Sequence, residues 1–395
     1  MRIPLLKDHH NHPFMYTSLS KGCINLEKIK NKNDALNIFS QGDSRKLTTV
    51  IGWYDNFYTF EDGELDKYSP LILFNTSLHD VFINKSAHDY LYYEYPDLID
   101  NINDKEWVEK NLVRILNFLI DLLLPDVEQL KSFYNKMLSL GIWHLEEMTL
   151  HSNKEIDIFK ESQLLHRTKF WAMQEVFETL SKEEKVAVHG IKVFTDGAFG
   201  TRTAKIKREY LGGGYGIMNY SIDEFNSLIE KVYYANKPIA IHAIGDEAID
   251  TTVKILSSFS NLPEVRIEHA QLISYKTAAK VKDLGFKLSM QPNFSVETKI
   301  YADRLDKDYC SMLNPFRMLI DNIGFIPGKD LLFGSDGMPH GAETALNTSL
   351  FPPLENQKLT IDEFVAGYCL DNYQHGHINV DINKTLQKVK IDIST

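Results

Sequence analysis

The sequence predicts an α/β protein built on a (β/α)8 barrel, the TIM-barrel architecture. Two observations predict this fold. Short apolar runs alternate with longer amphipathic stretches, and eight such runs occur along the chain. Strands that alternate with helices are typical of a parallel sheet, and eight repeats suffice to close that sheet into a barrel.

The expected strands are distributed along most of the chain. A barrel of this kind needs about 250 residues, so a chain of 395 residues leaves room for large insertions. One large domain with insertions is therefore the organisation we predict, and two domains are the alternative. The eight strands are expected at residues 3–12, 70–74, 142–148, 188–195, 238–242, 265–269, 286–291 and 331–335.

Helix signals fall between these strands. Residues 221–224 and 360–363 each have the Ser/Thr-x-x-Glu pattern of a capping box, which marks the start of a helix. Pro125 suits a first helical turn, apolar residues then recur at helical spacing, and Gly141 provides a stop. The pattern therefore predicts helices between successive strands of the sheet.

Two long segments do not fit a simple strand-to-helix connection. Residues from about 13 to 69 and from about 75 to 110 are rich in Tyr, Phe, Asn and Asp. We interpret them as insertions after strands one and two that stand over the barrel mouth, with Trp53 and His79 as candidate pocket residues. The predicted barrel domain spans residues 1–375, and residues 376–395 form a C-terminal tail.

Composition excludes several classes of function. The formal net charge is 43 − 54 = −11, which argues against nucleic-acid or anionic-membrane partners. The first residues reach Lys7 and Asp8 too soon for a signal-peptide core, and the apolar run at 116–124 is interrupted by Asp121. Three widely separated cysteines indicate neither a disulfide framework nor a thiolate metal site. We therefore expect a cytoplasmic protein.

Residues able to bind metal stand at the carboxyl ends of the expected strands. His10 and His12 close the first strand, and residues two apart project from the same face of a strand. Later strands end with or contain further candidates, and barrel enzymes collect their catalytic groups at this end. These later candidates are Lys192, His242, His269 and Asp336.

This arrangement resembles the amidohydrolase superfamily. The resemblance rests on Asp-x-His-x-His at 8–12 and on the Lys, His, His and Asp that follow on later strands. The sequence motifs that flank these residues are similar to those of amidohydrolase family 3, a branch that includes N-substituted formamide deformylases. The likeness spans roughly residues 8–370. Those motifs lie at residues 192–204, 242–246, 266–271, 289–292 and 334–336.

The resemblance implies one or two divalent metal ions, with zinc expected and Mn, Fe or Ni as alternatives. In the two-ion form, the implied ligands are His10, His12 and Asp336 for one ion, His242 and His269 for the other, and a carboxylated Lys192 as the bridge. Glu147 is the alternative bridge, because an unmodified ammonium has no lone pair to offer. A one-metal site needs neither bridge.

The implied activity is hydrolysis of a carbon–nitrogen bond other than a peptide bond, in an N-acyl or N-formyl amide of a small molecule. Asp336 would act as general acid and base, and His242, His269 or a second ion would polarise the carbonyl group. Asp196 and Arg202, after the fourth strand, are candidates for orienting the substrate.

Other functions remain open on the same residues. Deaminases, cyclic-amide hydrolases and ester hydrolases would use the same ligands, and a degenerate barrel would bind a small molecule without turning it over. An interaction scaffold has only the net charge in its favour. Relatives also carry a flanking β-sandwich, but only nine residues precede His10 and only 388–393 alternates like a strand. We therefore expect the sandwich to be largely absent, and a homodimer could cover the exposed flank.

Overall fold

The computed structural model describes residues 1–20, 22–43, 46–76, 78–102 and 104–395. The chain divides into two compact units, one made of Met1–Phe14 with Asp126–Thr395 and the other of Met15–Pro125. The helix α1 (Pro13–Ser20) contains the boundary between them. Each unit has its own sheet and is described separately below.

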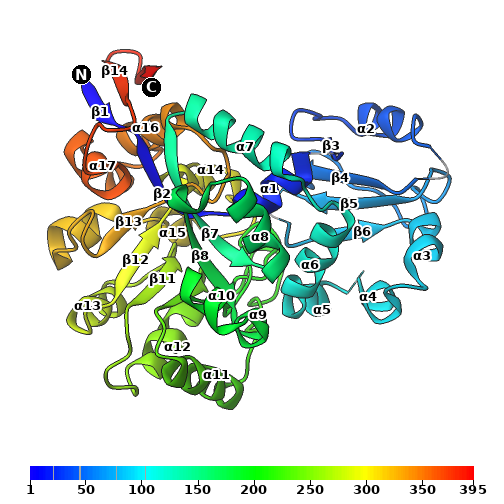
Figure 1. Cartoon of the computed structure of the whole chain (residues 1–395), viewed down its shortest axis with the longest axis horizontal. Helices are drawn as coiled ribbons and strands as arrows, with labels where there is room; N and C mark the ends of the chain where they lie inside the picture. The colour runs from blue at the N-terminus through cyan, green and yellow to red at the C-terminus, as the bar shows by residue number, and fades with distance from the viewer. Residues whose placement is uncertain (21, 44–45, 77, 103) are drawn as a thin grey trace. The chain divides into compact units, whose positions relative to one another are not determined.

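The first unit is a (β/α)8 barrel, which confirms the predicted fold class. Its eight strands pair in parallel with their neighbours in chain order (Figure 1). They are β2 (Leu6–Asn11), β7 (Ile142–Leu150), β8 (Thr168–Met173), β9 (Val188–Phe194), β10 (Ile239–Ala243), β11 (Val265–His269), β12 (Lys287–Met290) and β13 (Leu331–Phe333).

The first and last strands of this sheet meet beside the candidate ligands. The backbone N–H of Asp336 donates to the carbonyl oxygen of His10 at 2.8 Å, and the N–H of Ser335 donates to Asp8 Oδ1 at 2.8 Å. Gly334 permits this approach, because a Cβ at that position would collide with the backbone nitrogen of His10. Closure of the barrel therefore brings residues 10 and 336 together.

Helices surround the strands and cover the outside of the sheet (Figure 1). The capping boxes predicted at 221–224 and 360–363 are confirmed, and so is the helix expected between Pro125 and Gly141. None of the helices in the described ranges combines the length and apolar character needed to cross a membrane. They are α7 (Val127–Ser139), α8 (Asn153–Glu161), α9 (Gln174–Thr179), α10 (Lys182–Ala187), α11 (Ile222–Ala235), α12 (Asp246–Leu256), α13 (Tyr275–Asp283), α14 (Glu297–Ile300), α15 (Lys307–Met312), α16 (Ala342–Leu350) and α17 (Ile361–Tyr368), with the short helical turns η1 (Leu165–Arg167), η2 (Pro292–Val296), η3 (Met318–Ile323) and η4 (Glu355–Gln357).

One strand assignment is wrong. Residues 70–74 do form a strand, β5 (Leu71–Asn75), but this strand pairs in the sheet of the second unit. The second barrel strand is β7, and β8, which the sequence reading missed, completes the set of eight. Short apolar runs look alike in any sheet with a buried face, so hydrophobic pattern could not say which sheet each run joins.

The second unit has a four-stranded sheet and its own apolar core. Strands β3, β4 and β5 are parallel, whereas β6 runs antiparallel to β5. Val50, Leu71 and Leu73 are buried at the centre of this core, and Trp53 packs against them. The remaining elements of the unit are β3 (Ile24–Asn25), α2 (Lys32–Phe39), β4 (Thr48–Trp53), β6 (Val81–Ile83), α3 (Lys85–Leu91), α4 (Pro96–Asn101), α5 (Lys105–Lys110) and α6 (Leu112–Leu122).

The two ends of the chain belong to the same small antiparallel sheet of the first unit (Figure 1). Strand β14 (His377–Asn383) pairs on one side with β1 (Arg2–Pro4) and on the other with β15 (Lys388–Ser394). The strand expected at 3–12 is thus divided, and its first part belongs to this sheet rather than to the barrel. The alternating segment at 388–393 is a strand, as its pattern predicts.

Candidate metal centre

Three of the predicted ligands form a compact group at the carboxyl end of the barrel. His10 and His12 come from the end of β2 and its exit, and Asp336 follows β13. One ligand atom from each residue lies within 4.8 Å of the others. Asp336 Oδ1 is 3.7 Å from His10 Nε2 and 3.2 Å from His12 Nε2. The i, i+2 spacing on one strand and closure of the barrel together produce this group.

His242 and His269 lie beside this group. The ring centroid of His269 is 4.6 Å from that of His10 and 4.6 Å from that of His242. His269 has a φ of 68° and Asp336 a φ of 55°, both in the left-handed region that residues other than glycine seldom adopt. Left-handed backbone at such residues is a form of strain that collects at functional sites.

Three of these imidazoles have Nδ1 engaged by the protein. When Nδ1 donates its hydrogen, Nε2 is left with a lone pair, which is the usual state of a metal-binding histidine. The three bonds join Nδ1 of His10 to Glu268 Oε2 (2.6 Å), Nδ1 of His12 to Thr149 Oγ1 (2.8 Å) and Nδ1 of His269 to Gln291 Oε1 (2.8 Å). This donor set fits a divalent cation.

His242 is arranged differently. Its Nε2 lies 3.1 Å from the carbonyl oxygen of Gly197 and 3.5 Å from Asp196 Oδ1. Because a carbonyl oxygen can only accept, Nε2 of His242 is the protonated nitrogen in this arrangement. His242 would therefore present Nδ1, rather than Nε2, to a metal ion.

Lys192 is a candidate ligand whose Nζ has no hydrogen-bond partner among the described residues, although it lies 4.8 Å from the centre of the Phe194 ring. It lies on β9, its side chain is fully buried, and Nζ makes no hydrogen bond to any part of the chain that the structure describes. Burial lowers the pKa of this amine to about 8, against the opposing attraction of Glu268 and Asp336. A buried amine without a partner is costly, so this position favours a role in binding or catalysis.

The shifted pKa values of His10 and Asp336 favour cation binding. Burial, reinforced by the nearby Lys192 charge, lowers the pKa of His10 well below its usual range, so this imidazole is neutral at pH 7. Burial alone would raise the pKa of Asp336, but His10 and His12 outweigh it and the pKa is lowered. Asp336 is therefore ionised at neutral pH and can accept a proton.

Glu147 does not join the three-residue group in the described structure. Its Oε2 accepts from the backbone N–H of Phe14 at 2.9 Å, and its Oε1 accepts from the N–H of Thr149 at 3.1 Å. The same Oε1 is 3.8 Å from Nδ1 of His12. Glu147 therefore stands behind His12, on the side away from Nε2, and the bridging role expected for it remains a prediction.

The two candidates after the fourth strand occupy different surroundings. Asp196 is fully buried and accepts hydrogen bonds from the backbone N–H groups of Lys205 (3.0 Å), Ile244 (3.0 Å) and Gly245 (2.9 Å). It thereby ties the loop after β9 to the end of β10, beside His242. Arg202 adopts a φ of 60°, and its Nε is buried without a hydrogen-bond partner among the described residues.

Trp53 and His79 belong to the second unit. Trp53 Nε1 donates to the carbonyl oxygen of Tyr58 at 3.0 Å, and His79 Nδ1 lies 3.0 Å from Glu109 Oε2. Both polar contacts stay within that unit. The role expected for these residues in lining a pocket over the barrel remains a prediction.

The sequence reading missed the partners that hold the histidines, and Glu268 is the clearest case. Arg266 and Glu268 alternate with Ile267 on β11, so both face the barrel interior, and that spacing was a usable signal. Strict alternation would turn His269 away from them. The left-handed backbone of His269 redirects this side chain toward His10.

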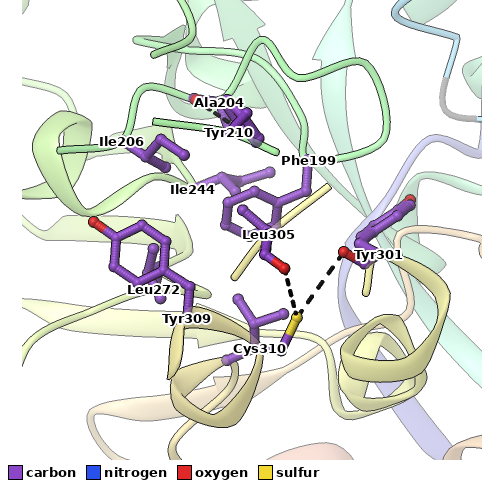
Figure 2. Close-up of a cluster of buried hydrophobic side chains, with 11 residues drawn as sticks. Phe199, Ala204, Ile206, Tyr210, Ile244, Leu272, Tyr301, Leu305, Tyr309 and Cys310 are labelled. Carbon is purple, nitrogen blue, oxygen red and sulfur yellow. Dashed lines mark hydrogen bonds between the residues drawn. The ribbon is translucent and has the colours of Figure 1, made fainter. Parts of the chain in front are cut away.

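Long loops on the carboxyl side of the barrel share a second apolar cluster (Figure 2). It combines residues that follow β9, β10, β11 and β12, and the first three of these strands carry Lys192, His242 and His269. Because these loops pack on one another, the strand ends below them are held in place. The cluster consists of Phe199, Ala204, Ile206, Tyr210, Ile244, Leu272, Tyr301, Leu305, Tyr309, Cys310 and Leu313.

A protein-family model described as the amidohydrolase family matches residues 141–341, about half of the chain. The chain belongs to the amidohydrolase family. This membership confirms the predicted superfamily, and the resemblance to formamide deformylases within it remains a prediction.

Other amidohydrolase relatives share parts of this chain. A Bacillus subtilis protein named "Putative amidohydrolase YtcJ" is 29% identical over 138 residues, which cover 33% of this chain and 26% of that protein. The chain thus matches about a quarter of the length of this curated relative. Two solved structures share the fold at 20% identity and a TM-score of 0.65. They are metal-dependent hydrolases, described as uncharacterized, from Pyrococcus horikoshii (88% of this chain, 74% of that one) and Pyrococcus furiosus (92% and 80%).

Proposed function

We propose that this amidohydrolase is a metal-dependent hydrolase that cleaves a carbon–nitrogen bond, other than a peptide bond, in a small-molecule amide. The observation that carries the proposal is the group formed by His10, His12 and Asp336, whose ligand atoms lie within 4.8 Å of one another. The group stands at the carboxyl end of a parallel barrel, where enzymes of this architecture place their catalytic residues.

His10, His12 and Asp336 would hold a divalent cation, with His242 and His269 available to a second. Imidazoles combined with a carboxylate suit zinc, and also Mn, Fe or Ni. When bound, such an ion supplies Lewis acidity and lowers the pKa of water. The neutral state of the buried His10 ring supports this role, because only an unprotonated nitrogen can be a ligand.

Asp336 would move the proton during hydrolysis. Its side chain is 17% exposed, whereas those of His10 and His12 are 1% and 10% exposed, so it is the member of the group most open to substrate and water. In our proposal its carboxylate accepts the proton of the attacking water. The same group then donates that proton to the leaving nitrogen, which leaves as a neutral amine.

Lys192 supports a two-ion version of the site. Its neutral amine could attack carbon dioxide, forming a nitrogen–carbon bond and releasing one proton, and the resulting carbamate would offer two oxygen ligands. The buried Nζ without a partner and its lowered pKa both favour the neutral, reactive amine. The one-ion version depends only on His10, His12 and Asp336.

Arg202 and Asp196 are the residues that we assign to substrate orientation. The buried Arg202 Nε without a partner could donate to a polar group of the substrate. Asp196 would act by holding the loop that carries Arg202 against the end of β10. Trp53 and His79 remain candidates for the rest of the pocket.

The proposal is tested with the purified full chain, grown with zinc or manganese. We expect bound divalent metal and turnover of at least one N-formyl amine, N-acyl amine or cyclic amide in a substrate panel. Release of ammonia would instead favour a deaminase, and turnover restricted to esters would favour an esterase. A His10→Ala/His12→Ala variant should lose metal, whereas His166→Ala, which alters an exposed histidine, should retain it. A wild-type protein without bound metal would contradict the proposal.

A further inference from the structure

A chain of buried ionic hydrogen bonds runs through the barrel interior to His10. It consists of Glu146 on β7, Arg266 and Glu268 on β11, and His10 at the end of β2. All four residues are at most 1% exposed. We define this set as the Arg266 chain. No step of the proposed hydrolysis uses Glu146, Arg266 or Glu268, so their charges require another explanation.

Arg266 is the central member. Its Nε donates to Glu268 Oε1, one NH2 group donates to Glu146 Oε2 at 2.7 Å, and the other donates to the carbonyl oxygen of His9 at 2.8 Å. The guanidinium plane therefore connects β11 with β7 and β2. A planar group with donors on three sides can set the position of a carboxylate more strictly than a single ammonium can.

Glu146 is the member of the Arg266 chain farthest from His10, and both of its carboxylate oxygens are hydrogen-bonded. Besides Arg266, it accepts from Trp171 Nε1 at 2.8 Å, and its other oxygen contacts His9 Nδ1 at 2.8 Å. Glu268 divides its oxygens differently, with Oε1 on Arg266 and Oε2 on His10 Nδ1 at 2.6 Å. Lys169 Nζ also lies 3.5 Å from Glu146 Oε1, so Glu146 has two cationic neighbours, and Glu268 presents a charged oxygen to His10.

His10 thereby differs from the other two histidines whose Nδ1 is engaged. The partner of His12 is the hydroxyl of Thr149, and that of His269 is the side-chain amide oxygen of Gln291. A carboxylate bonded to Nδ1 fixes the tautomer and makes Nε2 a stronger donor to a metal, more so than a neutral partner does. His10 is therefore the imidazole with the strongest electrostatic support.

We propose that Arg266 is a positioning residue that holds the Glu268 carboxylate against His10 and so sets the affinity of the site for a divalent cation. The inference rests on the proposed metal-dependent function and adds to it a residue that touches neither metal nor substrate. Glu146 anchors the guanidinium from the opposite side. The direct hydrogen bond from these three residues to the metal centre is the one between Glu268 and His10.

The test measures zinc affinity of the full-length protein by competition with a chromophoric chelator. Glu268→Gln keeps the shape of the side chain but removes its charge, and Arg266→Lys keeps a charge but cannot contact both carboxylates and the His9 carbonyl at once. We expect each to weaken zinc binding by about 10- to 100-fold. Thr149→Val, the matched change behind His12, should weaken it less.

A double variant separates positioning from general damage. If Arg266 acts through Glu268, the two substitutions disrupt the same interaction. The double variant Glu268→Gln/Arg266→Lys should then have the same zinc affinity as whichever single variant binds zinc less tightly. The visible spectrum of the cobalt-loaded protein should also change in Arg266→Lys, although this residue is not a ligand. Should Arg266→Lys fail to fold, Glu146→Gln replaces it and is expected to weaken zinc binding in the same direction.

The outcomes are distinct. Zinc affinity within twofold of wild type in folded Glu268→Gln and in the folded Arg266 or Glu146 variant would overturn the inference, and so would fully additive losses in the double variant. Normal affinity in Arg266→Lys alone, with a loss in Glu268→Gln, would remove Arg266 from the assignment. A wild-type chain that binds neither zinc nor manganese would instead contradict the proposed function itself.

Discussion

Buried charged side chains at two levels of the barrel interior differ in whether they have hydrogen-bond partners. Toward the amino ends of the strands, Glu146 and Arg266 are fully buried, and their hydrogen-bonding groups are taken up by one another, by Trp171 and by the backbone of His9. At the carboxyl end, Lys192 is equally buried, but its Nζ has no hydrogen-bond partner among the described residues. At the lower level the hydrogen bonds are made within the protein, whereas at the upper level an amine remains available to a ligand.

This difference separates structural charge from functional charge. A buried ion pair that is fully hydrogen-bonded contributes little net stability, but removing one member leaves the other uncompensated. A buried polar group without a partner lowers stability from the outset, and proteins retain such groups mainly at functional sites. Substitutions at the two levels should therefore have opposite effects on the stability of the metal-free protein.

The largest effect is expected at the upper level, from Asp336→Asn. The amide cannot accept the proton of the attacking water, so kcat/KM for the best substrate should fall by about 10³-fold or more. Thermal unfolding of the metal-free protein should change little. Asp246→Asn, whose carboxylate accepts from Lys207 N–H and from the Tyr309 hydroxyl, is the matched control and should stay close to wild-type activity. Undiminished turnover in Asp336→Asn would contradict the proton-transfer role assigned to Asp336.

Glu146→Gln tests the lower level. Loss of this charge leaves Arg266 with one carboxylate partner instead of two, and the free energy of unfolding should fall by about 3 kcal/mol. Urea denaturation of the metal-free protein measures this change. Glu128→Gln alters an exposed carboxylate that pairs with Lys131 at 2.9 Å, and should change stability by less than about 1 kcal/mol. Equal effects in the two variants would remove the distinction between the levels.

Lys192→Met should have the opposite effect on stability. Burial lowers the pKa of Lys192 to about 8, so at pH 7 the unfolded chain holds this proton more strongly than the folded chain. The resulting cost is present below about pH 8 and is relieved as the pH rises toward 10.5. Replacing the amine should therefore raise the stability of the metal-free protein at pH 7 by up to about 3 kcal/mol, while activity is lost. A destabilised variant would contradict this assignment.

The smallest expected effect concerns acid stability and His151, which follows β7. Neither ring nitrogen has a hydrogen-bond partner among the described residues, and burial lowers the pKa of this imidazole to about 3. The unfolded chain therefore binds an extra proton between about pH 6.5 and pH 3, and stability falls as the pH falls through this window.

At pH 5 this single group should cost about 2 kcal/mol, and His151→Phe should recover most of that amount relative to pH 7. Denaturant titrations of wild type and variant at the two pH values measure the difference. His166→Phe, at an exposed position, should leave the acid dependence unchanged. The same fall in stability in wild type and His151→Phe would show that His151 is not buried as a neutral group.

Much of the metal centre could be predicted from local pattern. His10 and His12 stand two residues apart on a strand, and a period of two places both on one face whatever the rest of the chain does. The alternation of strands and helices predicted the parallel barrel, and with it the shared end at which Asp336 would join them. Helix boundaries marked by capping residues, such as Ser221, were predicted for the same local reason.

Only tertiary structure decided the rest, because it depends on partners far apart in the sequence. The strands at 71–75 and 168–173 are both short and largely apolar, and packing alone assigns one to the second unit and the other to the barrel. The left-handed backbone of His269 and the long-range contact of His10 with Glu268 likewise have no local signal in residue pattern. The position of a residue in its strand determines which face its side chain lies on. Which residue it contacts, and the charge of that residue, are determined only when the sheet closes.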